Sequence, residues 1–244
     1  MESEDNEQSL TDHLVELRVR VVQALYGLIL GFGFCFIKSE AIFDIIRRPI
    51  VPFLGKGGLV FTAPMDKFMA HIKVSVLGGV ILSCPWWIYQ LWQFIAPGLY
   101  AKERKYTVAF ILSGSVLFLI GVCFVYFLVY PVAFEFLMNY GGGTDQAMIT
   151  ISEYLSFFIT TTIVFGLAFE LPLVLTLLGL AGLVDKAFLS GNRRYAIVLL
   201  AVVSAVITPS SDVMSMMMLM VPLCILYEIG VFMVGVLAQN RGSK

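Results

Sequence analysis

Residues 106–134 have the sequence YTVAFILSGSVLFLIGVCFVYFLVYPVAF, a run that contains no Asp, Glu, Lys or Arg. An α-helix rises about 1.5 Å per residue and the hydrocarbon core of a bilayer is about 30 Å thick, so about 20 such residues cross it. The apolar side chains occupy consecutive positions and do not alternate with polar ones, which argues against a β-barrel strand. Because only helices and closed barrels satisfy every backbone group in lipid, the run predicts a transmembrane helix.

The whole chain has the composition of a membrane protein. Of its 244 residues, 59% are hydrophobic and 14% are charged, and the mean hydropathy is +0.90. In a water-soluble domain of this size, most of that apolar surface would stay in contact with water. A net charge of −1 without a basic stripe excludes nucleic acid as a partner. The cysteines lack the spacing of a disulfide framework or a metal site, so we expect no metal and no cofactor.

Uncharged runs divide the chain into six expected spans. The fourth joins two runs on either side of Glu170, and the sixth joins two runs around Glu228. We place the spans at residues 20–38, 72–94, 107–131, 154–181, 194–209 and 212–236. The predicted fold class is all-α: a single polytopic membrane domain over residues 1–244, with six transmembrane helices in a curved bundle. Three prolines are expected to bend or end helices, namely Pro85, Pro131 and Pro222.

The distribution of Lys and Arg over the connections orients the chain. With the amino terminus in the cytoplasm, ten of the sixteen bases lie in or beside the inner segments 1–20, 95–106, 182–193 and 237–244. The other six lie in or beside the first outer segment, residues 39–71, and none lies in the second, residues 132–153. Both termini are therefore expected in the cytoplasm.

The first outer segment is expected to carry helices of its own. Apolar residues at helical spacing end at Pro49 and Pro52, which indicates an interfacial helix: Ile42, Phe43, Ile45 and Ile46. Thr62 is placed to cap the helix that continues through Asp66 into the second span.

The last two spans are expected to be short. Arg194 to Pro209 extends about 22 Å as a helix, against a hydrocarbon core of about 30 Å. Such a mismatch predicts a locally thinned bilayer around residues 205–216.

Two inner segments carry paired charges whose role the spacing leaves open. Glu16 and Arg20 lie one helical turn apart, which fits either an exposed ion pair or a binding carboxylate. Glu103 lies among three cations in the loop that follows Pro97 and Gly98, and it fits either local pairing or ligand binding.

Further acidic residues lie in or beside the spans. Glu170 is near the middle of the fourth span, where a carboxylate is costly unless it is protonated and bonded within the bundle or faces a partner. Pro172 removes the helical bond to the carbonyl of Ala168. Asp212 follows the turn after Thr208, where it serves either to cap the sixth helix or to contact a partner. Glu228 is expected to pair with Arg193 or Arg194 as a structural anchor.

Five blocks, in this order and spacing on six spans, resemble the TatC family, the core subunit of the twin-arginine (Sec-independent) protein translocase. The first four blocks are His13-Leu14-x-Glu16-Leu17-Arg18-x-Arg20, Phe94-x-x-Pro97-Gly98-Leu99-x-x-x-Glu103-Arg104, Phe165-Gly166-x-x-Phe169-Glu170-x-Pro172, and Thr208-Pro209 with Asp212. The fifth is Tyr227-Glu228-Ile229-Gly230. They extend from the amino terminus to the sixth span.

The resemblance implies that the inner surface recognises the paired arginines in the signal peptides of folded cargo. Glu16 and Glu103 occupy the family's carboxylate positions, and a carboxylate accepts a guanidinium through two parallel bonds that lysine cannot reproduce. Neighbouring bases are expected either to keep these carboxylates ionised while the site is empty or to contact anionic lipid: Arg18, Arg20, Arg104 and Lys105. Apolar residues are expected to border the path of the signal peptide: Phe94, Leu99 and Tyr100.

The resemblance also implies partners and a location. The family resides in the bilayer of the bacterial inner (plasma) membrane, works with single-span subunits of the TatA and TatB type, forms homo-oligomers within that complex, and draws on the proton motive force. Glu170, Pro172, Thr208 and Asp212 are the expected partner contacts. Family members commonly have Pro-Pro-Asp followed by Ser-Gln here, whereas this chain has Pro-Ser-Ser-Asp and then Ser215-Met216.

Two rival functions fit the residues less well. A proton-coupled secondary transporter would also bury a carboxylate such as Glu170, but the chain lacks an internal repeat and the series of buried charges that a proton relay needs. An intramembrane protease is disfavoured because neither His-Glu-x-x-His nor Gly-x-Ser-x-Gly occurs in the sequence. We therefore expect a protein that is not an enzyme.

Overall fold

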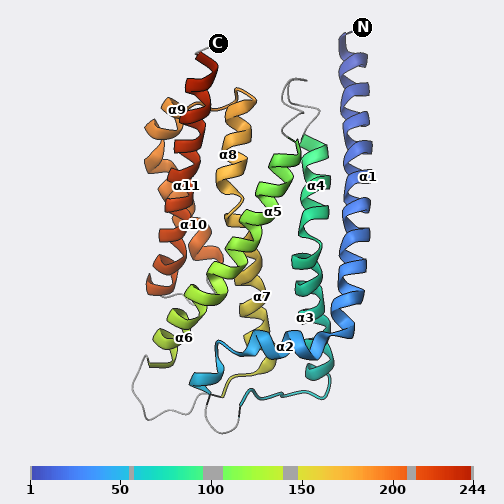
Figure 1. The fold of residues 1–244 in the computed structure, drawn as a ribbon, viewed down its shortest axis with the longest axis vertical. Helices are drawn as coiled ribbons and strands as arrows, with labels where there is room; N and C mark the ends of the chain where they lie inside the picture. Colours follow the sequence, from blue (N-terminus) through green and yellow to red (C-terminus); the bar gives the residue numbers. More distant parts are fainter. Residues whose placement is uncertain (1, 55–57, 96–106, 140–147, 208–212, 243–244) are drawn as a thin grey trace.

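The computed structural model describes the backbone of residues 2–54, 58–95, 107–139, 148–207 and 213–242. Nearly all of these residues are helical, and the β-pairing within them is limited to one parallel bridge between Val60 and Thr150. The all-α class predicted from the apolar runs is therefore confirmed (Figure 1).

The helices follow one another with few long connections. In chain order they are α1 (Glu2–Ile37), α2 (Ser39–Arg47), the 3₁₀ turn η1 (Val51–Phe53), α3 (Asp66–Leu82), α4 (Cys84–Ile95), α5 (Thr107–Phe124), the π-helical turn η4 (Val125–Val129), α6 (Tyr130–Asn139), α7 (Ile151–Ala168), α8 (Leu171–Leu180), α9 (Lys186–Gly191), α10 (Arg193–Ile207) and α11 (Val213–Gly242). The start of α1 and the finish of α11 lie at the same end of the bundle, here called the terminal end (Figure 1).

Four helical stretches in the described chain are long and apolar enough to cross a bilayer. They cover Val15–Ile37, Val108–Asn139, Ile151–Leu180 and Met216–Val236. The pair α3 and α4 passes the same test together but bends by 58° at its break, which gives up to five spans. Helix α10 has 15 residues and rises about 22 Å. This helix is the fifth expected span, one of the two expected to be short. The sixth expected span, the other of the two, lies within α11, which has 30 residues.

Helix α1 stands at one edge of the bundle and packs against α3 and α4 (Figure 1). The backbones of α1 and α3 lie close together at Gly31 and Gly79, where a Cβ on Gly79 would lie 2.8 Å from the amide nitrogen of Phe32. Lipid supplies no hydrophobic force between helices, so close backbone contact at small residues is a main source of their association. This glycine pair therefore sets how near α1 and α3 can lie.

Helix α2 crosses the bundle at the end opposite the terminal end (Figure 1). It forms where apolar residues at helical spacing predict a helix, and it ends at Arg47, two residues before Pro49. Two tyrosines of the bundle hold its carboxyl-terminal turn: the hydroxyl of Tyr154 donates to the carbonyl of Ile46 at 2.5 Å, and that of Tyr126 donates to Ile45 at 2.8 Å. The carbonyl of Ile45 also accepts from the backbone N–H of Arg48 at 3.2 Å, so Tyr126 gives it a second partner.

The predicted cap of α3 is wrong. Thr62 does not cap the helix; the N-cap position is Met65, which makes no side-chain capping bond. The carboxylate of Asp66 instead accepts from the backbone N–H groups of Thr62 and Ala63, both at 2.8 Å. The Thr62 hydroxyl also donates to the same carboxylate oxygen at 3.1 Å, so it acts as a donor in this turn and not as a capping acceptor.

The prolines affect their helices differently. Pro85 lies in the first turn of α4, directly after the break at Ser83, and the chain bends there as predicted. Pro131 follows the π-helical turn η4, a local widening that often accompanies a lost helical bond. Pro222 does not end its helix, because α11 continues on both sides of it.

The largest buried cluster forms where α3, η4, α6 and α7 meet, with further buried residues from α2 and α11. Its centre is Tyr130, whose ring stacks on Phe158 with centroids 4.4 Å apart. The Tyr130 hydroxyl donates to the carbonyl of Phe158 at 2.6 Å and lies 2.8 Å from the hydroxyl of Thr162. A polar group so deeply enclosed is tolerated because it is fully bonded.

Candidate functional site

The candidate residues fall into two regions of the structure. Glu16, Arg18 and Arg20 lie on α1 beside α4, and Glu170 with Pro172 lies at the junction of α7 and α8. Phe94 belongs to α4, but its side chain is outside the described part. The remaining candidates also lie outside the described residues: Leu99, Tyr100, Glu103, Arg104, Thr208 and Asp212.

Glu16 and Arg20 form the ion pair that their spacing allows. The Arg20 Nη2 atom lies 3.3 Å from Oε1 of Glu16, and the two side chains are 26% and 32% exposed. At this depth the pair is only partly screened by water, so it is stronger than a fully solvated one but remains modest. Glu16 is thus a carboxylate that already holds a guanidinium group.

Arg20 also reaches across to α4. Its Nη2 lies 3.4 Å from Oε1 of Gln93, and the Gln93 amide donates through Nε2 to the hydroxyl of Tyr89 at 2.7 Å. The Nε atom of Arg20 is buried and has no hydrogen-bond partner within the described residues. The site is therefore a polar seam between two helices, in which one guanidinium lies between a carboxylate and an amide.

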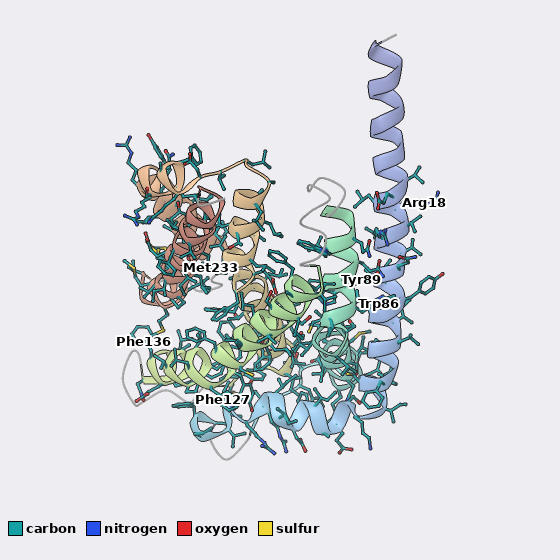
Figure 2. All side chains as sticks on the ribbon, turned by 45° about the horizontal axis from the view of Figure 1, so that its top comes forward. Arg18, Trp86, Tyr89, Phe127, Phe136 and Met233 are labelled. Atoms are coloured by element: carbon teal, nitrogen blue, oxygen red, sulfur yellow. The ribbon has the colours of Figure 1, made fainter. Side chains whose placement is uncertain are left out.

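A second contact fixes α1 against α4 below this seam. The indole Nε1 of Trp86 donates to the backbone carbonyl of Gln23 at 2.8 Å, and a Cβ on Gly27 would lie 2.3 Å from the indole ring. Figure 2 shows Trp86 and Tyr89 of α4 beside the part of α1 that carries Arg18. The indole occupies the space that a side chain at residue 27 would take, so the register of the two helices is set here.

Sequence reasoning missed three members of this seam. Tyr89, Gln93 and Trp86 were not singled out, although Tyr89 and Gln93 lie one turn apart on a largely apolar helix. That polar pair was the available signal, because amide and hydroxyl groups in a span need partners. Arg18, which was singled out, is exposed and forms no ion pair within the described residues.

Glu170 occupies the turn between α7 and α8 and is the N-cap residue of α8. The expected interruption near Pro172 is present, since α7 ends at Ala168 and Pro172 lies in the first turn of α8. A Cβ on Gly114 of α5 would lie 3.2 Å from Oε2 of Glu170, so the carboxyl is turned toward α5. Its Oε1 atom is buried without a hydrogen-bond partner within the described residues.

A buried carboxyl oxygen without a partner is costly, so this position is one of the few in the bundle that invites a further polar group. The sequence left open an alternative in which the carboxyl of Glu170 is hydrogen-bonded within the bundle. The unpartnered Oε1 atom does not support that alternative. The position therefore differs from Glu228, whose carboxylate is fully engaged.

Glu228 and Arg193 form the expected anchor. The Nε and Nη2 atoms of Arg193 each lie 2.8 Å from one oxygen of Glu228, so the two side chains meet through two parallel bonds. The contact joins the start of α10 to α11 near the terminal end (Figure 1). This geometry confirms the pairing predicted for Glu228.

Several known proteins similar to this chain are TatC proteins. The family model described as Sec-independent protein translocase protein (TatC) matches residues 12–222. The TatC protein of Desulforapulum autotrophicum is 38% identical over 244 residues, which cover 100% of this chain and 90% of the relative. The TatC protein of Magnetococcus marinus is 38% identical over 236 residues, or 96% and 87% of the two chains.

Solved structures give the same result. A crystal structure of a twin-arginine translocase receptor, TatC, matches with a TM-score of 0.81 at 33% identity, covering 91% of this chain and 97% of that one. A second, in DDM, matches with the same TM-score at 34% identity, covering 90% and 98%.

Proposed function

The chain belongs to the TatC family of Sec-independent protein translocases, and from that membership we propose that it binds the twin-arginine signal peptides of folded cargo through Glu16 and Glu103. As a TatC protein it is a core component of the Tat translocase, a multi-pass protein of the inner membrane and not an enzyme. It works in a complex with other Tat subunits. The proposal concerns which residues of this chain perform recognition.

The observation that carries the proposal is the contact between Glu16 and Arg20. A partly exposed carboxylate at the α1–α4 seam already holds a guanidinium group, which is the group that a signal arginine presents. Glu103 supplies the second carboxylate of the proposed site from the segment that follows α4. Two carboxylates favour two arginines over two lysines, because only guanidinium makes paired parallel bonds to a carboxylate.

The two ion pairs cannot supply the whole affinity. An ion pair in contact with water is worth about 1 kcal/mol, whereas micromolar binding requires about 8 kcal/mol. The remaining 6 kcal/mol or so corresponds to about 250 Å² of apolar surface at about 25 cal/mol per Å², before ordering costs. The apolar stretch of the signal peptide must therefore be buried, and Phe94, Leu99 and Tyr100 are the proposed border of its path.

The proposed topology has six spans with both termini in the cytoplasm. It is supported by the position of both chain ends at the terminal end of the bundle, which requires an even number of crossings (Figure 1). Four helical stretches pass the test of length and composition, the bent pair of α3 and α4 is counted as a fifth span, and α10 is the proposed sixth. Because α10 rises only about 22 Å, the bilayer is proposed to be thinner around residues 205–216.

The proposed contacts to single-span partner subunits are Glu170, Pro172, Thr208 and Asp212. The unpartnered Oε1 atom of Glu170 supports this assignment, because a polar side chain of a partner helix would satisfy it. Family membership disfavours the rival proton-coupled transporter.

Photocrosslinking tests the recognition site. A photoreactive residue in place of Val19, which is 47% exposed on α1, is combined with a twin-arginine signal peptide and its Lys-Lys variant. We expect a strong crosslink with the Arg-Arg peptide, a weak one with the Lys-Lys peptide, and loss of the Arg-Arg product in Glu16→Gln and in Glu103→Gln.

The matched control is Glu40→Gln, which makes the same chemical change on the exposed surface of α2 at the opposite end of the bundle. It should leave the crosslink intact. An undiminished Arg-Arg crosslink in folded Glu103→Gln protein would overturn the assignment.

A further inference from the structure

We infer that Arg20 is a resident guanidinium that occupies Glu16 in the empty receptor and shifts onto Gln93 when a signal arginine takes its place. The inference rests on the proposed function, because it assumes that Glu16 binds an arginine of the signal peptide. Arg20 would then compete with the signal peptide for the carboxylate of Glu16.

Arg20 lies between two acceptors and makes a short hydrogen bond to neither. The same Nη2 atom is 3.3 Å from Glu16 and 3.4 Å from Gln93, whereas a strong charge-assisted bond to a carboxylate measures about 2.7 to 2.9 Å. The buried Nε atom has no acceptor within the described residues, so the donors of this guanidinium are incompletely used. A group held in this way is easily displaced.

Gln93 is prepared to receive the displaced group. Its Nε2 donates to Tyr89 one turn earlier on α4, and this bond leaves the carbonyl oxygen of the amide facing Arg20. Arg193 differs from Arg20, because it places two nitrogens at 2.8 Å from Glu228 and bonds to no other side chain within the described residues. An arginine that serves as an anchor is bonded like Arg193, and Arg20 is bonded differently.

The helices themselves do not need to move during the exchange. Trp86 bonds to Gln23 and fills the space at Gly27, so the α1–α4 contact stays fixed while one side chain rotates. The shift from Glu16 to Gln93 is therefore a local event. It requires neither a lid nor a domain movement.

The exchange has a defined thermodynamic consequence. The apparent affinity of any ligand for Glu16 is its intrinsic affinity multiplied by the fraction of receptors in which Glu16 is free. Arg20 lowers that fraction by the same factor for every ligand. It therefore weakens the binding of Arg-Arg and Lys-Lys peptides by the same factor. The ratio of the two affinities is set by the carboxylates alone.

Peptide titration of purified full-length protein tests the inference. In Arg20→Gln, the dissociation constants of fluorescent Arg-Arg and Lys-Lys peptides are both expected to fall about two- to fivefold, the range set by a partly exposed ion pair, with their ratio unchanged. Arg18→Gln is the charge-matched control, because it removes one positive charge two residues away and no ion pair. Its gain should be smaller.

Gln93→Leu supplies a change of opposite sign. Without the amide, the displaced guanidinium has no acceptor, so peptide binding should weaken about twofold in the wild-type background. In the Arg20→Gln background the same substitution should have no effect. A merely structural role for Gln93 would give equal effects in both backgrounds, which would contradict the inference.

The outcomes separate the two claims. If the wild-type protein fails to bind the Arg-Arg peptide, or if Glu16→Gln binds it equally well, the proposed function fails and the inference fails with it. If Glu16→Gln loses affinity while Arg20→Gln binds no tighter than Arg18→Gln, only the inference is wrong.

Discussion

The contact between Gly27 and Trp86 gives a prediction whose size follows from the structure. In Gly27→Ala the new Cβ would lie 2.3 Å from Cδ1 of Trp86, so the indole must move by about 1.2 Å to reach an ordinary contact of about 3.5 Å. That movement breaks its 2.8 Å bond to Gln23, at about 1 kcal/mol. Overpacking adds about 1 to 2 kcal/mol, the lower part of its range, because Trp86 is 45% exposed and can swing outward.

One term opposes this loss. Alanine is favoured over glycine within a helix by up to about 1 kcal/mol. The net free energy of unfolding should therefore fall by about 1 to 2 kcal/mol in Gly27→Ala. Gly33→Ala is the matched control on the same helix, because a Cβ there meets no atom within 4 Å, and it should stabilise the protein by up to about 1 kcal/mol.

The assay is reversible unfolding of the purified protein in mixed micelles, for both variants and for Gly27→Ala in a Trp86→Ala background. Removal of the indole should abolish the penalty, so that Gly27→Ala then becomes neutral or stabilising. Equal shifts for the variants at residues 27 and 33, or a penalty that persists without the indole, would refute this account of the α1–α4 contact.

Three further substitutions probe the bundle by the same unfolding measurement. Tyr130→Phe should cost about 2 kcal/mol, because it leaves the buried hydroxyl of Thr162 without its partner, and an unchanged midpoint would contradict this. Arg193→Gln should cost at most about 1 kcal/mol, because the pair with Glu228 is half exposed, and the loss should shrink in high salt. Gly79→Ala should cost about 2 kcal/mol or more, since its Cβ meets the backbone of α1, which cannot swing aside as a side chain can; an unchanged or raised stability, as expected for Gly33→Ala, would argue against it.

The sequence predicts the helices well because lipid imposes a single rule on them. An uncharged run long enough to cross the bilayer has to be helical, and each expected span overlaps a helix of the structure. Helix ends follow a different rule. Helix α6 continues past the charged residue Glu135 to Asn139, because a helix persists into water when its own bonds and neighbours support it.

Prolines show the limit of a local rule. Pro85 lies at a 58° bend, whereas Pro222 lies within an unbroken helix, although both lack the backbone N–H. The flanking residues differ, since Ser83 directly before the bend caps the broken turn by donating to the carbonyl of Gly79. Neighbouring helices decide whether a lost bond becomes a bend, and one sequence does not report those neighbours.

The candidate site divides in the same way. The pairing of Glu16 with Arg20 follows from a spacing of four residues on one helix, so the sequence predicts its geometry. The contact from Arg20 to Gln93 joins residues 73 positions apart. It depends on the register of α1 against α4, which packing at Trp86 sets and which no local pattern encodes.

Equilibrium binding of a twin-arginine signal peptide to the Glu16→Gln/Glu103→Gln double variant tests the central claim most directly. With each ion pair worth about 1 kcal/mol, the double variant should bind the Arg-Arg peptide about 30-fold more weakly than the wild-type protein while unfolding at the same midpoint. An affinity within threefold of wild type would contradict recognition of arginine by this pair of carboxylates.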